Sequence, residues 1–192
     1  NHTTDDYPST DDVLEGAADI IAERVADNPD IRRYVRERAT RQGRLVSRKR
    51  RGADEDPNFS TYYGFSVDVG NAKPHQVLAI RRGESEKAVS ASIEVDDDSF
   101  LRWIRERVER GAGGDGEAAV DGVDRPKDRE ARRRVDAAIE DAWKRLLHPR
   151  TERHIRSELE DEADEHAISV FALNLENLLM QREDELPVIL RR

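Results

Sequence analysis

The chain contains no cysteine and only one methionine among its 192 residues. The absence of cysteine excludes disulfide bonds, thiol catalysis and zinc sites built on thiolates. No apolar run is long enough to span a bilayer, and the first residues lack the pattern of a signal peptide. These absences predict a soluble, cytoplasmic protein without a membrane partner.

Aromatic residues are also scarce, since four Phe, four Tyr and two Trp make up 5% of the chain. Hydrophobic residues reach 36%, which is low but sufficient for a core. Charged residues reach 39%, well above the average for globular proteins. We therefore expect a mainly α-helical protein with elongated packing and a large solvated surface.

The net charge of −9 argues against a basic domain that coats nucleic acid along its whole length. Phosphate groups are bound by local positive potential, so a contact with nucleic acid has to come from a short basic segment. The strongly basic segment of this chain lies within residues 38–51. Its candidate nucleic-acid-binding residues are Arg41, Arg44, Arg48, Lys49, Arg50 and Arg51.

This basic segment has two interpretations. It can bind the phosphates of RNA or DNA, although no aromatic side chains lie between its arginines to stack on bases. It can also be a solvated loop whose charge is offset by the acidic residues 54–56 that follow. The pattern alone leaves both interpretations open.

The longest periodic pattern lies near the C-terminus. Apolar residues recur at helical spacing from Ile155 to Leu178, and acidic residues occupy the opposite face. This predicts one long amphipathic helix, preceded at Pro149 by a turn from a separate helix over 139–147. Part of the apolar stripe is expected to be exposed, namely Phe171, Leu175, Leu178 and Leu179.

Helical spacing also predicts a helix over residues 13–25 and a second from Ile31, forming a helical hairpin. Residues 88–95 alternate with a period of two and predict one short β element. The expected organisation is a frayed start, two helical regions and a tail. Their bounds are 1–12, 13–98, 99–181 and 182–192, with a Gly-rich insert over 111–124.

Two side-chain clusters have a functional and a structural interpretation. The aromatic cluster of Phe59, Tyr62, Tyr63 and Phe65 can stack on bases, but it more often anchors neighbouring helices. The acidic residues 96–98 can hold a divalent cation, but carboxylates before a helix usually stabilise its N-terminus. Packing and capping are the expected roles.

The sequence lacks a recognisable active site. None of the five histidines pairs with another at the spacing of a metal site. His166 with Glu162 is compatible with a metal, but a surface salt bridge on so charged a helix gives the same pattern. Nucleophile elbows and Ser/His/Asp arrangements are missing. We therefore expect a protein that is not an enzyme, with no catalytic residues, no metal and no cofactor.

Two blocks of sequence resemble the Tex family of bacterial transcription accessory proteins. The first runs from Phe59 through the aromatic "YYGF" to the stretch that begins "PHQVLAIRRGE" at Pro74. The second comprises "DAWKRLL" from Asp141, "IRSEL" from Ile155 and the helix that follows Glu165. The resemblance covers about residues 11–181, whereas the insert at 111–124 and the tail at 182–192 depart from the family pattern.

The Tex resemblance implies an internal helical portion with a helix-turn-helix-like region. In that family this portion precedes an RNase H-like domain, helix-hairpin-helix units and an OB-fold RNA-binding module, so the chain is expected to be part of a longer protein. Nucleic-acid affinity is attributed chiefly to the OB-fold module, and no binding residue can be carried over to this chain.

The function implied is a non-enzymatic helical scaffold of a transcription accessory protein that binds RNA or DNA, mainly through other domains. Its long helix would be the surface on which those domains dock. One alternative is that the basic segment makes this region a nucleic-acid-binding module. Another is that the acidic face of the long helix, around Glu160, Asp161 and Asp164, docks on the transcription machinery.

Overall fold

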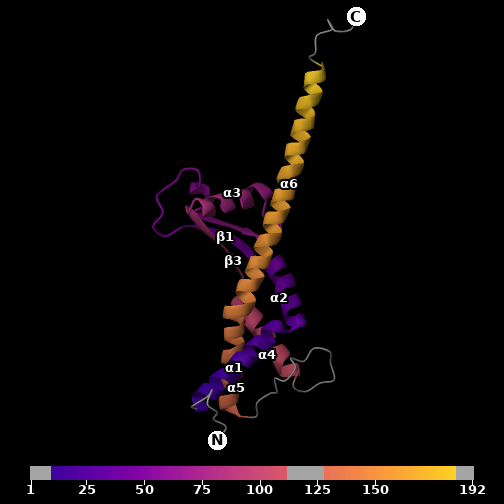
Figure 1. The fold of residues 1–192 in the computed structure, drawn as a ribbon. Coiled ribbons are helices and arrows are strands. Elements are labelled where there is room, and N and C mark those ends of the chain that lie inside the picture. The colour runs from indigo at the N-terminus through magenta and orange to yellow at the C-terminus, as the bar shows by residue number, and fades with distance from the viewer. Residues whose placement is uncertain (1–9, 112–127, 185–192) are drawn as a thin grey trace, which may run out of the picture. The chain divides into compact units, whose positions relative to one another are not determined.

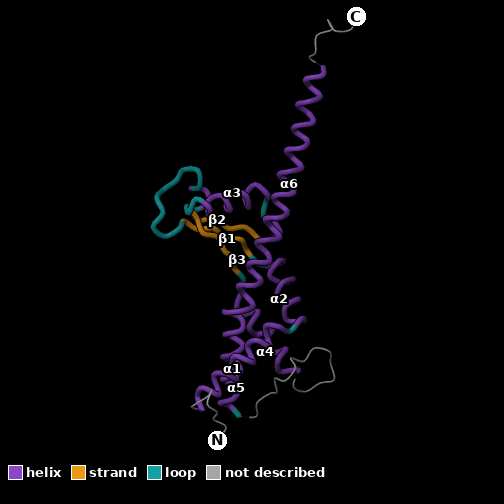
Figure 2. The backbone as a smooth tube through the Cα atoms, viewed as in Figure 1, coloured by secondary structure: helices purple, strands orange, loops and turns teal. Residues whose placement is uncertain are grey.

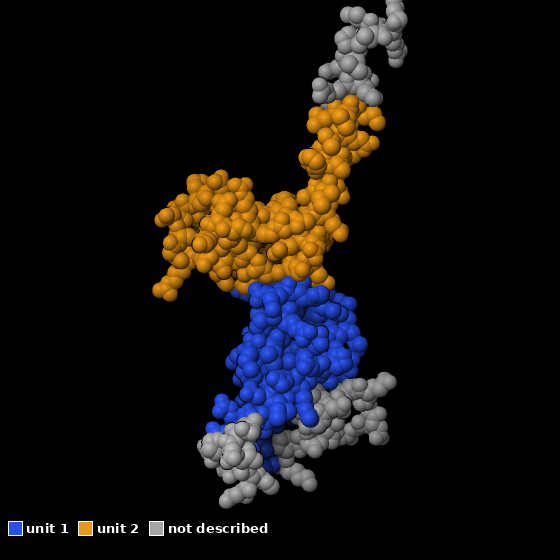
Figure 3. Space-filling model, in the orientation of Figure 1, with its two compact units in different colours: residues 1–44, 68–70, 93–155 blue, residues 45–67, 71–92, 156–192 orange. Residues whose placement is uncertain are grey.

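A computed structural model describes residues 10–111 and 128–184 (Figure 1). The chain divides into two compact units, shown in blue and orange in Figure 3. Unit 1 comprises residues 1–44, 68–70 and 93–155, and unit 2 comprises 45–67, 71–92 and 156–192. The expected Gly-rich insert beyond residue 111, the start at 1–9 and the tail beyond Asp184 lie outside the described residues.

Unit 1 is built from helices. These are α1 (Thr10–Asp27), α2 (Pro29–Gln42), α4 (Asp97–Gly111) and α5 (Arg129–Asp141). Helix α1 packs on α2 and α5, and α4 packs on α5. The expected hairpin of α1 and α2 is confirmed: the side chain of Asn28 caps α2 by accepting hydrogen bonds from the N–H groups of Asp30 and Ile31, at 3.0 and 3.1 Å.

The core of unit 1 contains the largest buried side chain of the described residues, Trp143, which is 2% exposed. Its ring stacks on Phe100 with the centroids 5.0 Å apart, and its Nε1 donates a hydrogen bond to Asp97 at 3.0 Å. Apolar residues of α1, α2 and α4, such as Val25, Ile31 and Ile104, are buried in the same unit. A buried indole with a satisfied N–H is a strong packing anchor.

The prediction of a turn between two helices at Pro149 is wrong, because the backbone stays helical there. Helix α5 passes into a π-helical segment, η3 (Ala142–Leu147), and then into α6 (His148–Asp184). The N–H of His148 bonds to the carbonyl of Trp143, five residues back. A proline inside a helix loses one hydrogen bond and crowds the preceding turn, and the wider π turn directly before Pro149 accommodates it.

Unit 2 contains most of a small sheet in the order β2-β1-β3, drawn in orange in Figure 2. Strand β1 spans Arg44–Lys49, β2 spans Gly64–Asp68 and β3 spans Val89–Glu94. The N–H of Lys49 bonds to the carbonyl of Tyr63, which sets the end of β1 beside the start of β2. The expected strand over 88–95 is confirmed, but the sheet has three strands where one β element was expected.

Helix α3 (Pro74–Ser85) and the later part of α6 complete unit 2, and short 3₁₀ turns lie at Ser60–Tyr62 and Val69–Asn71. The mainly α-helical class, with a small β element and a long C-terminal helix, is confirmed. In the part of the chain that the structure describes, no helix combines the length and apolar character that crossing a membrane requires.

Candidate functional site

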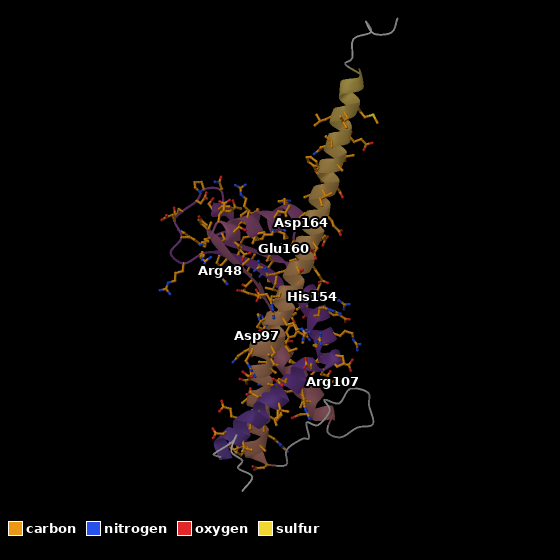
Figure 4. The ribbon with its side chains drawn as sticks, viewed as in Figure 1. Arg48, Asp97, Arg107, His154, Glu160 and Asp164 are labelled. Atoms are coloured by element: carbon orange, nitrogen blue, oxygen red, sulfur yellow. The ribbon has the colours of Figure 1, made fainter. Side chains whose placement is uncertain are left out.

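The six basic candidate residues lie on different kinds of structure. Arg41 is in the last turn of α2, Arg44 opens β1, and Arg48 and Lys49 end β1. Arg48 is labelled in Figure 4. Arg50 and Arg51 lead into a turn at Gly52, whose φ is +80°. The segment is therefore divided between the end of α2 and strand β1, and only Arg50 and Arg51 of the six candidates lie in a loop as the second interpretation expects.

Ion pairs within each unit engage part of this basic segment. In unit 1, Arg44 lies 3.4 Å from a carboxylate oxygen of Asp68. In unit 2, Lys49 lies 3.7 Å from Glu55 and over the ring of Tyr63, at 5.4 Å from its centroid. Successive residues of a strand point to opposite faces, so Arg48 and Lys49 do not present one continuous basic surface.

Arg38, the basic residue that precedes the candidates, has a structural role. Its guanidinium donates to Ser99 Oγ at 2.6 Å and to Gln42 Oε1 at 2.9 Å, and it also bonds to the hydroxyl of Tyr34. These bonds join α2 to the start of α4 inside unit 1. The guanidinium of Arg38 therefore stabilises the packing of α2 against α4.

The aromatic cluster packs within unit 2, as expected. Phe59 is 3% exposed and packs with Ala88 and Val89, and Tyr62 and Tyr63 lie against the same cluster. The hydroxyl of Tyr63 accepts a hydrogen bond from the N–H of Asp56 at 2.6 Å. The packing interpretation of these rings is confirmed.

The acidic residues 96–98 serve the start of α4. Asp96 accepts a hydrogen bond from the N–H of Ser99 at 3.3 Å, and Asp97 accepts from Trp143. Among the described residues, no group of three His, Cys, Asp or Glu side chains is arranged to hold a metal ion. The capping interpretation is confirmed for Asp96, whereas Asp97 binds a core indole.

Several charged residues of α6 are engaged inside unit 2 (Figure 4). Asp164 accepts two hydrogen bonds from Arg81, at 2.7 and 2.8 Å. These bonds, together with the attraction of the same guanidinium, hold the pKa of Asp164 below its ordinary value and raise the pKa of Arg81. Glu160 lies 3.8 Å from Arg156. The acidic face proposed for partner docking is therefore partly used within the unit.

A second network joins α6 to β3 in unit 2. Arg156 pairs with Glu84 of α3 and donates to the carbonyl of Ala91 at 3.1 Å. Glu84 in turn accepts a hydrogen bond from the N–H of Ala91 at 2.9 Å. Side chains of both charged partners are about three-quarters buried, with 27% and 25% exposed. One ion pair thus satisfies both backbone groups of a strand residue.

The C-terminal half of α6 has a broad apolar surface, as the sequence predicted for four of its residues. Its large apolar side chains are between 44% and 69% exposed. We call this set the α6 stripe, whose members lie on more than one side of the helix: Ile168, Val170, Phe171, Leu173, Leu175, Leu178, Leu179 and Met180.

Unit 1 contains a cleft of about 500 Å³ that the sequence pattern did not indicate. Side chains of α2 and of the start of α6 line it, including His154 (Figure 4). We call it the arginine cleft, and its lining residues are Pro29, Arg32, Arg33, Arg36, Leu147, Arg150, Thr151 and His154. The available signal was the i, i+4 spacing of Arg32 with Arg36 and of Arg150 with His154, which places each pair on one helical face.

Comparison with known proteins finds relatives that are much longer than this chain. The matched segment is 32% identical over 173 residues to YdcI of Bacillus subtilis, an uncharacterized protein, covering 89% of this chain and 22% of YdcI. It is 29% identical over 172 residues to protein tex of Bordetella pertussis, covering 87% of this chain and 21% of that protein. Human S1 RNA-binding domain-containing protein 1 is 27% identical over 180 residues, covering 88% of this chain and 17% of that protein.

These relatives agree with the resemblance seen in the aromatic block at Phe59 and in the long helix. The chain spans about a fifth of the length of the curated relatives it matches. Residues 2–171 match the family described as Tex central region-like. The chain therefore belongs to the Tex central region-like family.

Proposed function

We propose that this chain is a non-enzymatic helical scaffold within a Tex-type transcription accessory protein that binds nucleic acid. Its α6 stripe is the surface on which other domains of such a protein dock. RNA or DNA is bound mainly by those other domains, and the human relative carries an RNA-binding domain in its name. The protein acts in the cytoplasm, with transcription complexes as its setting.

The observation that carries this proposal is the exposure of the α6 stripe. Phe171 is 68% exposed and Leu178 is 60% exposed, whereas Ala163, earlier on the same helix, is 1% exposed. Large contiguous apolar surfaces on otherwise polar proteins are typical of interaction sites. A helix with an apolar face is commonly recognised by a complementary hydrophobic groove. The length of the relatives offers additional domains to supply such a groove.

The test measures docking in trans. The part of YdcI outside its matched region is produced separately and titrated by calorimetry with this chain. We expect binding that the double variant Phe171→Glu, Leu178→Glu abolishes. The control is Ile20→Glu, because Ile20 is also an exposed apolar helix residue, at 54%, but belongs to α1. The proposal fails if the matched region of YdcI binds in this assay and the present chain does not.

A second candidate function is nucleic-acid binding by the basic segment itself. What supports it is the exposure of Arg48, Arg50 and Arg51 around the end of β1. Fluorescently labelled single-stranded RNA and duplex DNA would be titrated into the chain at low and moderate salt. The variant has Arg48, Lys49, Arg50 and Arg51 changed to Ser. Loss of salt-sensitive binding in this variant would assign nucleic-acid binding to the basic segment. Equal binding by the variant and the unmodified chain would exclude this function for the segment.

A further inference from the structure

The arginine cleft concentrates positive charge in an acidic chain. The chain has a net charge of −9, yet four arginines and no carboxylate are among the described residues that line this cleft. Its volume of about 500 Å³ lies within the range of ligand sites in proteins. Local positive potential in a concave site attracts anions, because low-dielectric walls focus the field.

Nearby carboxylates neutralise only part of this charge. Asp30 lies 2.6 Å from Arg33 and 3.3 Å from Arg107, and Asp27 lies 3.9 Å from Arg150. Neither Arg32 nor Arg36 forms an ion pair with a carboxylate in the described part of the chain. Both are exposed on α2, on the flank of the face that buries Ile31 and Val35. Two cationic side chains therefore remain available for a ligand.

Two helices supply the two walls of the cleft. Arg32 and Arg36 are one turn apart on α2, and Arg150 is one turn before His154 on α6. The guanidinium group fits phosphate in a bidentate way, and the hydroxyl of Thr151 adds a neutral donor. The buried faces of both helices are fixed by packing, since Ile31, Val35 and Ile155 are at most 1% exposed. The donors are thus held on rigid elements.

The composition of the cleft favours phosphates over bases or peptides. Its described lining has no aromatic ring other than the imidazole of His154, so it lacks a platform for base stacking. Apart from Pro29 and the buried Leu147, it also lacks the apolar anchors that dominate protein interfaces. Contacts from arginines and a hydroxyl are typical of sequence-independent binding to the nucleic-acid backbone.

We infer that the arginine cleft binds the phosphodiester backbone of a nucleic-acid strand. Arg32 and Arg36 are the main phosphate ligands, and Arg150 and Thr151 contact the strand from the opposite wall. This inference rests on the proposed function, in which the protein works on nucleic acid. It adds a contact within the scaffold itself, separate from the basic segment at the end of β1.

The test uses the full 192-residue chain and fluorescence anisotropy with labelled single-stranded RNA and duplex DNA at several salt concentrations. The cleft variant is Arg32→Gln, Arg36→Gln, since glutamine removes the charge and has a helix propensity similar to that of arginine. The matched control is Arg129→Gln, Arg133→Gln on α5, where both arginines are exposed and the charge change is the same. Circular dichroism verifies that the variants retain their helices.

We expect salt-sensitive binding by the unmodified chain. The affinity of the cleft variant for nucleic acid should be lower by a factor of about ten. The slope of log K against log salt should fall in magnitude by about two. The control should stay within about twofold of the unmodified chain. Inorganic phosphate and a mononucleotide are added as competitors, and neither should displace the strand at concentrations where an unlabelled oligonucleotide does.

Several outcomes would overturn the inference. Equal losses in the cleft variant and the α5 control would show a general charge effect. Tighter, cleft-dependent binding of poly-glutamate than of RNA would identify an acidic peptide as the ligand. Full displacement by inorganic phosphate would reduce the cleft to a small-anion site, and absence of binding to either nucleic acid would exclude it. None of these results affects the binding measured in the docking titration with the YdcI segment. The scaffold proposal is therefore tested independently of the arginine cleft.

Discussion

Unit 1 and unit 2 differ in the interactions that stabilise each of them internally. Unit 1 buries large rings, with Phe100 and Trp143 stacked and both at most 2% exposed. Unit 2 has a smaller aromatic cluster around Phe59 and relies on charged side chains that join its elements, such as Arg156 with Glu84 and Arg81 with Asp164. Apolar burial contributes more to stability than partly exposed ion pairs do.

This contrast predicts that core changes in unit 1 cost more than changes to the charged contacts of unit 2. Both tryptophans of the chain, Trp103 and Trp143, belong to unit 1. Tryptophan fluorescence therefore monitors unit 1, and hydrogen exchange of α3 and β3 amides monitors unit 2.

The largest effect is expected for Trp143→Ala. The substitution removes the stacked ring and the hydrogen bond to Asp97, and large aromatic-to-alanine changes in cores cost about 3–5 kcal/mol. The measurement is the free energy of unfolding in urea, followed by circular dichroism. Trp103→Ala is the control, because Trp103 is only partly buried and stacks on Tyr34. A smaller loss for Trp143→Ala than for the control would show that burial of large rings does not determine the stability of unit 1.

Two glycines sharpen the comparison at the level of the backbone. In unit 1, a Cβ on Gly43 would lie 2.4 Å from the carbonyl oxygen of Ala39, a backbone atom that cannot move away. In unit 2, a Cβ on Gly83 would lie 2.8 Å from Val89 Cγ2 and 2.9 Å from Phe59 Cδ1, both side-chain atoms. We expect Gly43→Ala to cost about 2–3 kcal/mol and Gly83→Ala about 1–2 kcal/mol.

Thermal melts of both glycine variants test this order. The control is Gly64→Ala, where no atom lies within 4 Å of the added Cβ. The control should melt close to the unmodified chain. If Gly83→Ala proved the more damaging change, the small aromatic cluster of unit 2 would be the more rigid of the two environments.

A moderate effect is expected for Glu84→Gln. The amide can still accept the hydrogen bond from Ala91, but Arg156 loses its charged partner, at a cost of about 1–2 kcal/mol. Faster hydrogen exchange of β3 amides would report this loss. Glu86→Gln is the matched control, since its pair with Arg82 lies in solvent and contributes little. Identical exchange rates for the two variants would show that the Arg156 network does not stabilise the sheet.

The smallest effect is a change in acid sensitivity from Asp164→Asn. The hydrogen bonds from Arg81 hold the pKa of Asp164 below its ordinary value of 3.8. A lowered pKa in the folded state stabilises the fold above pH 3.8, and this contribution disappears as the pH falls through the folded-state pKa. The variant should therefore lose stability less steeply than the unmodified chain below that pH.

Urea midpoints between pH 2 and pH 7 check the Asp164 prediction. Asp161→Asn changes an exposed carboxylate of the same helix and should follow the unmodified chain. A steeper acid loss in Asp164→Asn would contradict the sign of the predicted effect.

Helical periodicity predicted most of the fold, because regular helices leave a strong repeat in the sequence. The strand over Val89–Glu94 was predicted from the alternation of residues 88–95 with a period of two. Strand β1 was missed because it is short and rich in charge: its buried residues Leu45, Val46 and Ser47 lie in a row without alternation. The helix through Pro149 was missed because a proline usually ends a helix, and the π turn before it has no sequence signature.

The candidate site was less predictable than the fold. Charge density along the chain pointed to the basic segment at 41–51, where residues are neighbours in sequence. The arginine cleft combines Arg32 and Arg36 with Arg150, more than a hundred positions away in the chain. A single sequence contains no signal for such a pairing, since it depends on how α2 and α6 meet within unit 1. The exposure of Phe171 and Leu178 was predicted, because an apolar stripe longer than the available core has to remain uncovered.

The geometry of the arginine cleft depends on the number of residues in the π-helical segment η3 before it. Each residue of an α-helix advances the side-chain direction by about 100°, so the extra residue in a π turn rotates everything that follows relative to the helix before it. Arg150, Thr151 and His154, which line the cleft with α2 in unit 1, follow Ala142–Leu147, so the extra residue contributes to the direction in which they point. Deleting one residue there would leave a continuous helix of ordinary geometry, with Arg150, Thr151 and His154 turned away from their present direction.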